Sequence, residues 1–226
     1  MTKALIFDSG TLINLSMNGL LYILPELKKK FPGKFLITSK VKWETVDKPI
    51  NIERFELEAL EIQELIESKV LELPDAFEIP EKIIEKETKI LLDQANHYLQ
   101  ANGRWLDIVS EAEMTCLALY DECERRGIEP IIAIDERTTR LLAEEPRALE
   151  ELISRKLHTS AKLIEKDFKI FSKYKFIRSP ELVYVAFKKK LIRIKNPRFL
   201  EAALYATKFK GASISWEEIK ELKRLG

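Results

Sequence analysis

Two short apolar runs in this sequence each end on a carboxylate. Residues 4–7 (ALIF) are followed by Asp8, and residues 131–134 (IIAI) are followed by Asp135 and Glu136. Short apolar runs bounded by turn residues predict buried strands of a parallel sheet. Ligands bind just beyond the carboxyl ends of the strands in such a sheet, so we expect these side chains to meet at one edge.

Further acidic residues belong to the same predicted site. Glu44 follows a second candidate strand, and Glu111 and Glu113 open a helical stretch after Ser110. Clustered carboxylates repel one another and need a compensating cation, and their hard oxygen atoms suit Mg²⁺ or Mn²⁺. Together with the strand-end carboxylates, these residues predict an acidic pocket that binds a divalent metal ion.

Each of these carboxylates also has a simpler interpretation. Asp8 is a common turn residue, and Glu44 could be a solvated charge on a helix. Glu113 stands three residues after Ser110, which is the spacing of a helix capping box. Asp135 could cap the helix that follows it. Capping and metal binding do not exclude one another. The occurrence of all four carboxylates together is less easily explained by chance than any one of them.

The elements that must position these residues alternate between strand and helix, which predicts an α/β fold with a central parallel sheet. A chain of 226 residues with 46% hydrophobic residues is large enough for one domain with a substantial core. A capping box at Ser215 begins the last predicted helix. Apolar periodicity and turn residues predict strands over 3–7, 34–38, 70–73 and 131–134, helices over 18–30, 39–49, 52–68, 80–100, 110–126 and from 137, an irregular segment over 146–178, and three helices over 180–226.

Composition limits the classes of partner and compartment. The formal net charge is +1, so any basic surface that binds nucleic acid must be local. We expect a cytoplasmic protein that does not enter the membrane, because no signal peptide or apolar stretch of 18 residues is visible. Charged residues make up 33%, mostly Lys and Glu in helical stretches, as in proteins from hot environments. Cys116 and Cys123 are too far apart along one helix to bond to each other.

Three motifs resemble those of the PIN-domain family. Residues 6–15 (IFDSGTLINL) are similar to its first motif, residues 110–113 (SEAE) to its third acidic motif, and residues 134–140 (IDERTTR) to its late-strand motif. Glu44 stands where that family places its second acid. The resemblance extends over residues 1–143 and over the helical tail from 180.

The resemblance implies a three-layer α/β/α sandwich with a metal-dependent ribonuclease site. It makes Asp8, Glu44, Glu113 and Asp135 the expected catalytic residues. Asp8, Glu113 and Asp135 are the expected ligands of Mg²⁺ or Mn²⁺, and Thr11, Glu111 and Glu136 are expected to support them. Many relatives are toxins of toxin–antitoxin pairs, so an antitoxin and a homodimer are expected partners. We expect one PIN-like domain over 1–226, with a basic insertion over 144–179 and a helical extension over 180–226.

The basic insertion is the predicted binding surface for RNA. Cations for phosphate groups and aromatic rings for stacking are the combination that binds single strands. The alternative is a basic helix and strand whose aromatic residues, including Phe168, Phe171 and Tyr174, belong to the core. The cations of the predicted surface are Arg155, Lys156, Lys162, Lys166, Lys169 and Lys173.

Two other functions compete with a ribonuclease. Residues 7–12 (FDSGTL) are similar at first sight to the nucleophile motif of haloacid-dehalogenase phosphatases. That motif requires a second Asp, and Gly10 occupies the position, so the general acid is missing. The remaining alternative is a catalytically weak or inactive module of the same fold that binds RNA or protein. His97 and His158 are predicted to be surface residues without a catalytic role.

Overall fold

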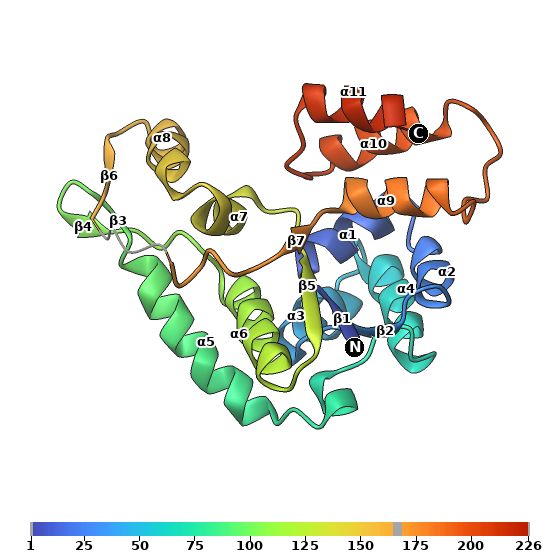
Figure 1. Cartoon of the computed structure of the whole chain (residues 1–226), viewed down its shortest axis with the longest axis horizontal. Helices are drawn as coiled ribbons and strands as arrows, with labels where there is room; N and C mark the ends of the chain where they lie inside the picture. Colours follow the sequence, from blue (N-terminus) through green and yellow to red (C-terminus); the bar gives the residue numbers. More distant parts are fainter. Residues whose placement is uncertain (1, 165–168, 226) are drawn as a thin grey trace.

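Four parallel strands form the centre of the molecule. The computed structural model describes residues 2–164 and 169–225. The strand order is β2-β1-β5-β7, which places β1 in the interior of the sheet (Figure 1). The strands are β1 Lys3–Phe7, β2 Gly33–Leu36, β5 Glu129–Ala133 and β7 Phe176–Ile177. The predicted strands at 3–7, 34–38 and 131–134 are confirmed within one or two residues.

The register brings the two predicted carboxylate positions to the same edge. Phe7 pairs with Ala133, and the N–H of Asp8 donates a hydrogen bond of 2.9 Å to the Ala133 carbonyl. On the other side of β1, Lys3 pairs with Gly33. A Cβ atom on Gly33 would lie 2.0 Å from the Lys3 carbonyl oxygen, so only glycine fits this close approach of two backbones.

Helices flank the sheet on both faces, so the predicted three-layer α/β/α sandwich is confirmed. Helix α6 (Glu111–Arg125) packs against β1 and β5, and α5 (Glu81–Asn96) packs on the outside of α6 (Figure 1). Helix α2 (Ile23–Lys28) contacts β2 and α9 (Ser179–Lys188). Residues such as Cys116 and Leu117 on α6 are fully buried because that helix lies between the sheet and α5.

Two helical segments differ from the sequence prediction. Of the helix predicted over 18–30, only α2 (Ile23–Lys28) forms, and it follows a turn in which Gly19 has a φ of 62°. A helix that was not predicted, α1 (Ser9–Met17), precedes this turn. The apolar spacing alone missed α1 because its start depends on the Asp8 side chain. The segment predicted over 39–49 begins as α3 (Ser39–Lys42) and continues as a π-helical turn over Trp43–Asp47. The prediction did not distinguish that turn from an ordinary helix.

The segment predicted to be irregular is largely ordered. It contains α8 (Pro146–Leu157), which follows α7 (Arg137–Glu144), and the short strand β6 (Ala161–Leu163). Strand β6 pairs antiparallel with β3 (Leu99–Ala101), which also pairs with β4 (Arg104–Trp105). This small second sheet was not predicted, because strands of two or three residues carry no periodic signal. The remaining predicted strand, at 70–73, is a single bridge between Leu36 and Glu72.

Three helices form the C-terminal part, as predicted. Helix α9 lies against α10 (Phe199–Phe209), which pairs with α11 (Trp216–Leu225). The predicted capping box is present, since the Ser215 N–H donates to Glu218 and the Glu218 N–H donates to Ser215 Oγ. Leu200, Leu204, Ile214 and Ile219 form a small hydrophobic cluster of their own, separate from the main core.

The two cysteines of the sequence lie in the described part of the chain, on α6. Cys116 and Cys123 are both buried and carry free thiols. None of the helices in residues 2–164 and 169–225 has the length and apolarity needed to cross a bilayer.

Candidate functional site

Asp8 stands between β1 and α1 and is almost completely buried, with 4% exposed. Its Oδ2 accepts a hydrogen bond of 3.0 Å from the Gly10 N–H, which is the usual N-cap contact of Asp. A Cβ atom on Gly10 would lie 3.2 Å from that oxygen, so glycine leaves the carboxylate room. The other oxygen, Oδ1, has no hydrogen-bond partner among the described residues. A buried acceptor without a protein partner is costly, and an ordered water, an ion or a functional role usually explains it.

Glu113 lies beside Asp8, on the first turn of α6. The predicted capping box is present, because the Ser110 N–H donates to Glu113 Oε2 and the Glu113 N–H donates to Ser110 Oγ. Thr139, on α7, also donates a hydrogen bond from Oγ1 to Glu113 Oε2. Capping therefore fixes the orientation of this carboxylate and does not remove it from the site.

Burial and neighbouring acidic groups raise the pKa of both carboxyl groups. Burial is the main cause that raises the pKa of Asp8 to about 7, and the charge of Glu113 adds to it. Burial also raises the pKa of Glu113, with Glu136 contributing a smaller repulsion. Without a cation, the pair holds part of a proton at neutral pH. A nearby divalent cation would favour the doubly ionised form.

Glu44 approaches the pair from the π-helical turn. Its Oε2 accepts a hydrogen bond of 3.0 Å from Ser9 Oγ, and its charge contributes to the raised pKa of Asp8. Short π-helical turns occur frequently at functional sites. Glu111 is more exposed, and its carboxylate lies 2.6 Å from Lys40 Nζ. Glu44 is thus close to Asp8 and Glu113, whereas Glu111 forms an ion pair with Lys40 at the rim of the site.

Asp135 is held by α9. Its Oδ1 accepts a hydrogen bond of 2.7 Å from the Ser179 N–H, and its Oδ2 accepts one of 2.7 Å from Ser179 Oγ. Burial raises the pKa of Asp135, while these bonds and one to Asn14 oppose the rise. The interpretation of Asp135 as the cap of the next helix is wrong. Glu136 caps α7, because its Oε2 accepts a hydrogen bond of 2.9 Å from the Thr139 N–H.

The buried pair fits a hard divalent cation. Across residues 2–164 and 169–225, no three His, Cys, Asp or Glu side chains are grouped so that they could hold a metal ion. Mg²⁺, however, keeps several waters and is often bound through one or two carboxylates together with substrate phosphate. Asp8 and Glu113 supply two carboxylates, and Thr11 carries a buried hydroxyl without a hydrogen-bond partner in the described chain. Metal binding by Asp8, Glu113 and Asp135 stays a prediction.

The cations predicted to bind RNA have different contacts in the structure, and only some of them are near the carboxylates. Lys156 reaches the site, with its Nζ 3.8 Å from Glu136 Oε1. Arg155 forms an ion pair with Glu151 one turn away on the same helix. The ammonium group of Lys173 lies 2.6 Å from an oxygen of Asp121.

The other residues of the predicted RNA surface also differ, because some are exposed and others are buried. Lys162 and Lys169 are exposed, and Lys166 and Phe168 lie outside the described residues. Phe171 and Tyr174 are buried, which confirms the core interpretation for these two aromatic residues. RNA binding by the insertion therefore stays a prediction that Lys156 supports best.

Four residues that position the carboxylates were missed in the sequence. They are Ser9, Asn14, Thr139 and Ser179, and each is a small polar side chain that bonds to a predicted acid. Asn14 offered one signal, because it is a polar residue between the apolar residues Ile13 and Leu15. Ser179 offered almost none, because its partner lies 44 residues away in the sequence.

A scan against protein-family models and searches of curated proteins and of solved structures found no match to this chain. The resemblance to PIN-domain motifs therefore stays a prediction. The carboxylates, and the elements that hold them, are what indicates a functional site in this chain.

Proposed function

We propose that this protein is a metal-dependent ribonuclease that hydrolyses phosphodiester bonds of RNA. The observation that carries the proposal is the buried, partnerless Oδ1 of Asp8 beside Glu113, at the carboxyl end of a central parallel strand. Ligands of open α/β sheets bind at this edge. A carboxyl group with a strongly shifted pKa at such an edge is a candidate functional group.

In this proposal Asp8 and Glu113 hold one Mg²⁺ or Mn²⁺ ion, with Thr11 as a further oxygen donor. Such an ion supplies charge neutralisation at the phosphate and lowers the pKa of water. Ser110 and Thr139 fix Glu113, so its carboxylate needs little reorganisation when the ion binds. Glu44 is fixed through Oε2 by Ser9, and its Oε1 is the proposed acceptor of a proton from the attacking water.

RNA is the proposed substrate because cations border the carboxylates and the sequence motifs resemble a ribonuclease family. Lys40 lies between Glu111 and Glu44, and Lys156 lies beside Glu136 and Thr138. Both ammonium groups can neutralise phosphates on either side of the bond that is cleaved. Asp135 is proposed to complete the site, either as a ligand or by anchoring α9 through Ser179.

Cleavage of single-stranded RNA by Asp8→Asn tests the proposal. Asn keeps the size and the capping oxygen of Asp8 but removes the charge that holds the cation. We expect the cleavage rate with Mn²⁺ to fall by about two orders of magnitude or more, on the scale of removing one major electrostatic contributor. Chelation should have the same effect on the wild type. The control is Asp93→Asn, which removes an exposed carboxylate on α5 and should cleave like the wild type.

Retained activity in Asp8→Asn would refute the catalytic assignment. A wild-type protein that cleaves no RNA with any divalent metal, yet binds RNA, would favour the alternative of a non-catalytic binding module.

A toxin role is part of the same proposal. An apolar cavity of about 420 Å³ borders Glu44, with Ile13, Met17 and Phe55 among its lining residues. An antitoxin that packed an apolar segment there would contact the rim of the carboxylate site. Co-expression with the neighbouring gene product, followed by purification and a cleavage assay, tests this role. The role requires a stable complex that loses RNA cleavage.

A further inference from the structure

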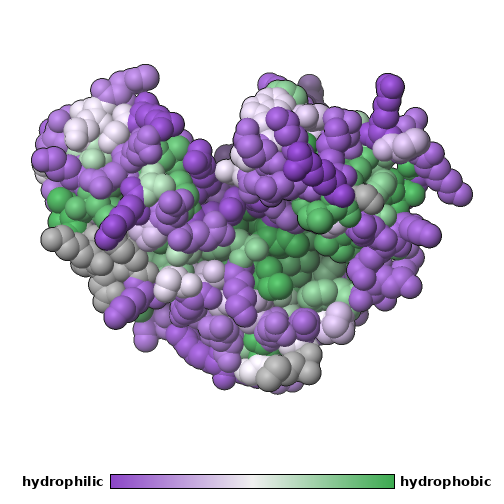
Figure 2. Space-filling model, turned by 45° about the horizontal axis from the view of Figure 1, so that its top comes forward, coloured by the Kyte–Doolittle hydropathy of each residue, from purple (hydrophilic) through white to green (hydrophobic). Residues whose placement is uncertain are grey.

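A second cavity, of about 530 Å³, lies between α7 and the hairpin of α10 and α11. Figure 2 shows it as a notch between two lobes, bordered mainly by hydrophilic residues. Its volume is within the usual range of ligand sites, about 300–1,000 Å³. One wall comes from α7 and the other from residues 208–215, so the helical extension builds half of the cavity.

Helix α7 separates this cavity from the carboxylates. Arg137, Arg140 and Glu144 line the cavity at helical spacing, which places them on one face of α7. Thr139 lies on another face and bonds to Glu113. At the floor, the N–H of Ser213 donates a hydrogen bond of 3.1 Å to the carbonyl of Asp135. The cavity and the carboxylate site are therefore neighbours that share a helix and a floor.

The charges in the cavity favour an anionic ligand. Four cationic side chains and three acidic ones line it. Two of the acids are already engaged, Glu144 by Arg140 at 2.9 Å and Glu218 by Arg178 at 2.8 Å. Arg137 is exposed, and within the described chain no ion pair engages its guanidinium group. Its charge remains available to a phosphate.

Exposed aromatic rings stand beside the cations. Phe209 lines the cavity and is 73% exposed, and Trp216 is 47% exposed with its ring centre 5.9 Å from that of Phe209. The Lys208 ammonium group lies 4.9 Å from the centre of the Trp216 ring. Phe209 and Trp216 contact each other, and contiguous exposed apolar patches rimmed by polar residues mark interaction sites. Cations that contact phosphates, next to rings that stack on bases, are the means by which proteins bind single strands.

We propose that this notch binds single-stranded RNA on its way to the carboxylate site. Arg137 and Lys208 contact phosphates, and Phe209 and Trp216 stack on unpaired bases. The inference rests on the proposed ribonuclease function, because it assigns the substrate path of that site. In this proposal the main RNA contacts come from α7 and the C-terminal hairpin. The segment over 155–173, which the sequence predicted as the RNA-binding surface, contributes less. Base-paired RNA does not offer free base faces, so a duplex should bind more weakly.

Binding of a fluorescein-labelled 12-nucleotide single-stranded RNA tests the proposal. The full chain carries Asp8→Asn and the buffer contains a chelator, so binding is measured without cleavage. Fluorescence anisotropy is followed at several salt concentrations. We expect Arg137→Gln to weaken binding about three- to tenfold and to reduce the slope of log K against log salt by about 0.7. Phe209→Leu should weaken binding about tenfold and leave the slope unchanged, because it removes stacking and no charge.

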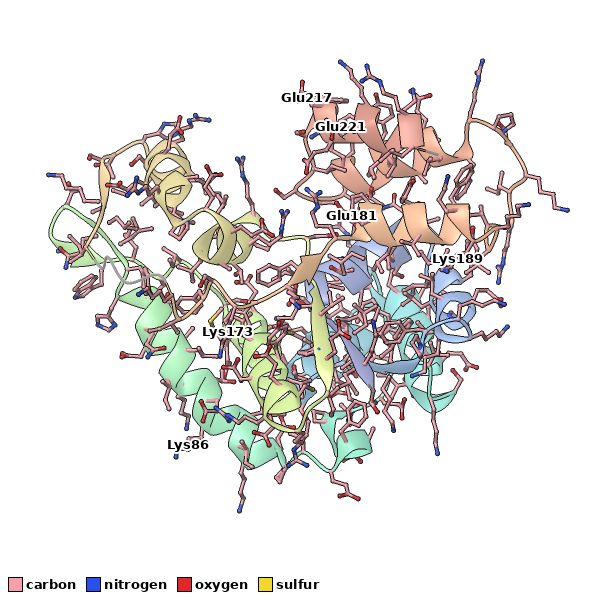
Figure 3. All side chains as sticks on the ribbon, viewed as in Figure 1. Lys86, Lys173, Glu181, Lys189, Glu217 and Glu221 are labelled. Carbon is pink, nitrogen blue, oxygen red and sulfur yellow. The ribbon has the colours of Figure 1, made fainter. Side chains whose placement is uncertain are left out.

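Matched controls remove a charge or a ring elsewhere. Lys86 lies on α5, on the far side of the molecule from α10 and α11 (Figure 3), and Lys86→Gln should bind RNA like the parent protein. Trp105→Leu removes an exposed ring from β4 and should also have no effect. Thermal melting of every variant shows whether it folds. Arg137 and Phe209 are exposed, so their loss should leave the melting temperature within a few degrees of the parent.

Two results would overturn the proposal. One is unchanged affinity and slope in a folded Arg137→Gln, Phe209→Leu double variant, and the other is an Asp8→Asn protein that binds no single-stranded RNA at low salt. Failure of the ribonuclease proposal looks different, since the notch variants would still weaken binding while the wild type cleaves no RNA. A protein with Trp216 as its sole tryptophan, made by Trp43→Phe and Trp105→Phe, gives a second readout. RNA should quench its fluorescence, and a base-paired control should quench it less.

Discussion

At the scale of single residues, the site stores unfavourable energy in Asp8. The carboxyl group has a pKa of about 7 in the folded chain and an ordinary value of 3.8 when it is exposed. Below pH 4 the group is protonated in both states and has no effect on stability. Between pH 4 and 7, unfolding releases a proton, so the stability of the metal-free protein falls as pH rises. Above pH 7 the loss is complete, at about 4 kcal/mol for a shift of this size.

The first prediction is that Asp8→Asn stabilises the metal-free protein at pH 8 and much less at pH 4. Asparagine keeps the helix cap but carries no charge to bury. Thermal melting in a chelator at several pH values measures this, with Asp93→Asn as the control for an exposed carboxylate. Mn²⁺ should raise the melting temperature of the wild type at pH 8 and that of Asp8→Asn far less. Parallel pH profiles for the two proteins would contradict the assignment.

At the scale of elements, the edge strand β2 depends on one glycine. A methyl group on residue 33 would meet the Lys3 carbonyl carbon at 2.6 Å as well as its oxygen, and the Phe31 ring at 2.9 Å. Two of these three atoms are backbone, so no rotation of a side chain relieves the clash. Strand β2 would have to move away from β1, which ends at Phe7, next to Asp8.

The second prediction is that Gly33→Ala destabilises the protein by about 2 kcal/mol or more, as overpacking does. Urea denaturation followed by circular dichroism measures the free energy of unfolding. Gly103→Ala is the control, because its added Cβ would meet open space and only the positive φ of 75° is unfavourable. That variant should lose about 1 kcal/mol. A Gly33→Ala protein at least as stable as Gly103→Ala would show that the sheet tolerates the separation.

The elements also show where sequence reasoning succeeds and where it fails. Buried strands such as 3–7 and 131–134 were predictable, because a short continuous apolar run between turn residues is typical of a buried strand. The capping boxes at Ser110 and Ser215 were predictable because both partners lie within four residues. Contacts between distant segments were not predictable. Ser179 and Thr139 hold the acids of the site, yet nothing local in the sequence specifies their partners.

At the scale of the whole molecule, Arg178 joins the C-terminal helices to the rest. Its guanidinium group forms ion pairs with Glu181 on α9 and Glu218 on α11, and it donates a hydrogen bond of 2.6 Å to the Ser213 carbonyl. The arginine is buried, whereas Glu218 is partly exposed. The small cluster around Leu204 and Ile219 joins α10 to α11, while Phe199 and Ala203 of α10 belong to the main core. Helix α11 can therefore loosen more easily than α10, and the sheet need not unfold.

The third prediction is that Arg178→Gln loosens the hairpin selectively. We expect a loss of about 2 kcal/mol, below the range for fully buried ion pairs because Glu218 contacts solvent. Hydrogen exchange should accelerate in α10 and α11 and stay unchanged in β1 and β5. Lys189→Gln, an exposed change at the end of α9 (Figure 3), is the control. Equal protection of the hairpin in both variants would rule out this role of Arg178.

The order of the strands has a consequence for the chain during its synthesis. Strand β1 is made first but lies in the interior of the sheet, and β5 comes to it from residues 129–133. The carboxylate of Asp135 forms its hydrogen bonds only after Ser179, 44 residues later in the sequence, has been made. Most of the chain must therefore be made before the strand ends that carry Asp8 and Asp135, and the Ser179 bonds to Asp135, are all in place. The acidic edge of the sheet is thus among the last parts of the molecule to be completed during synthesis.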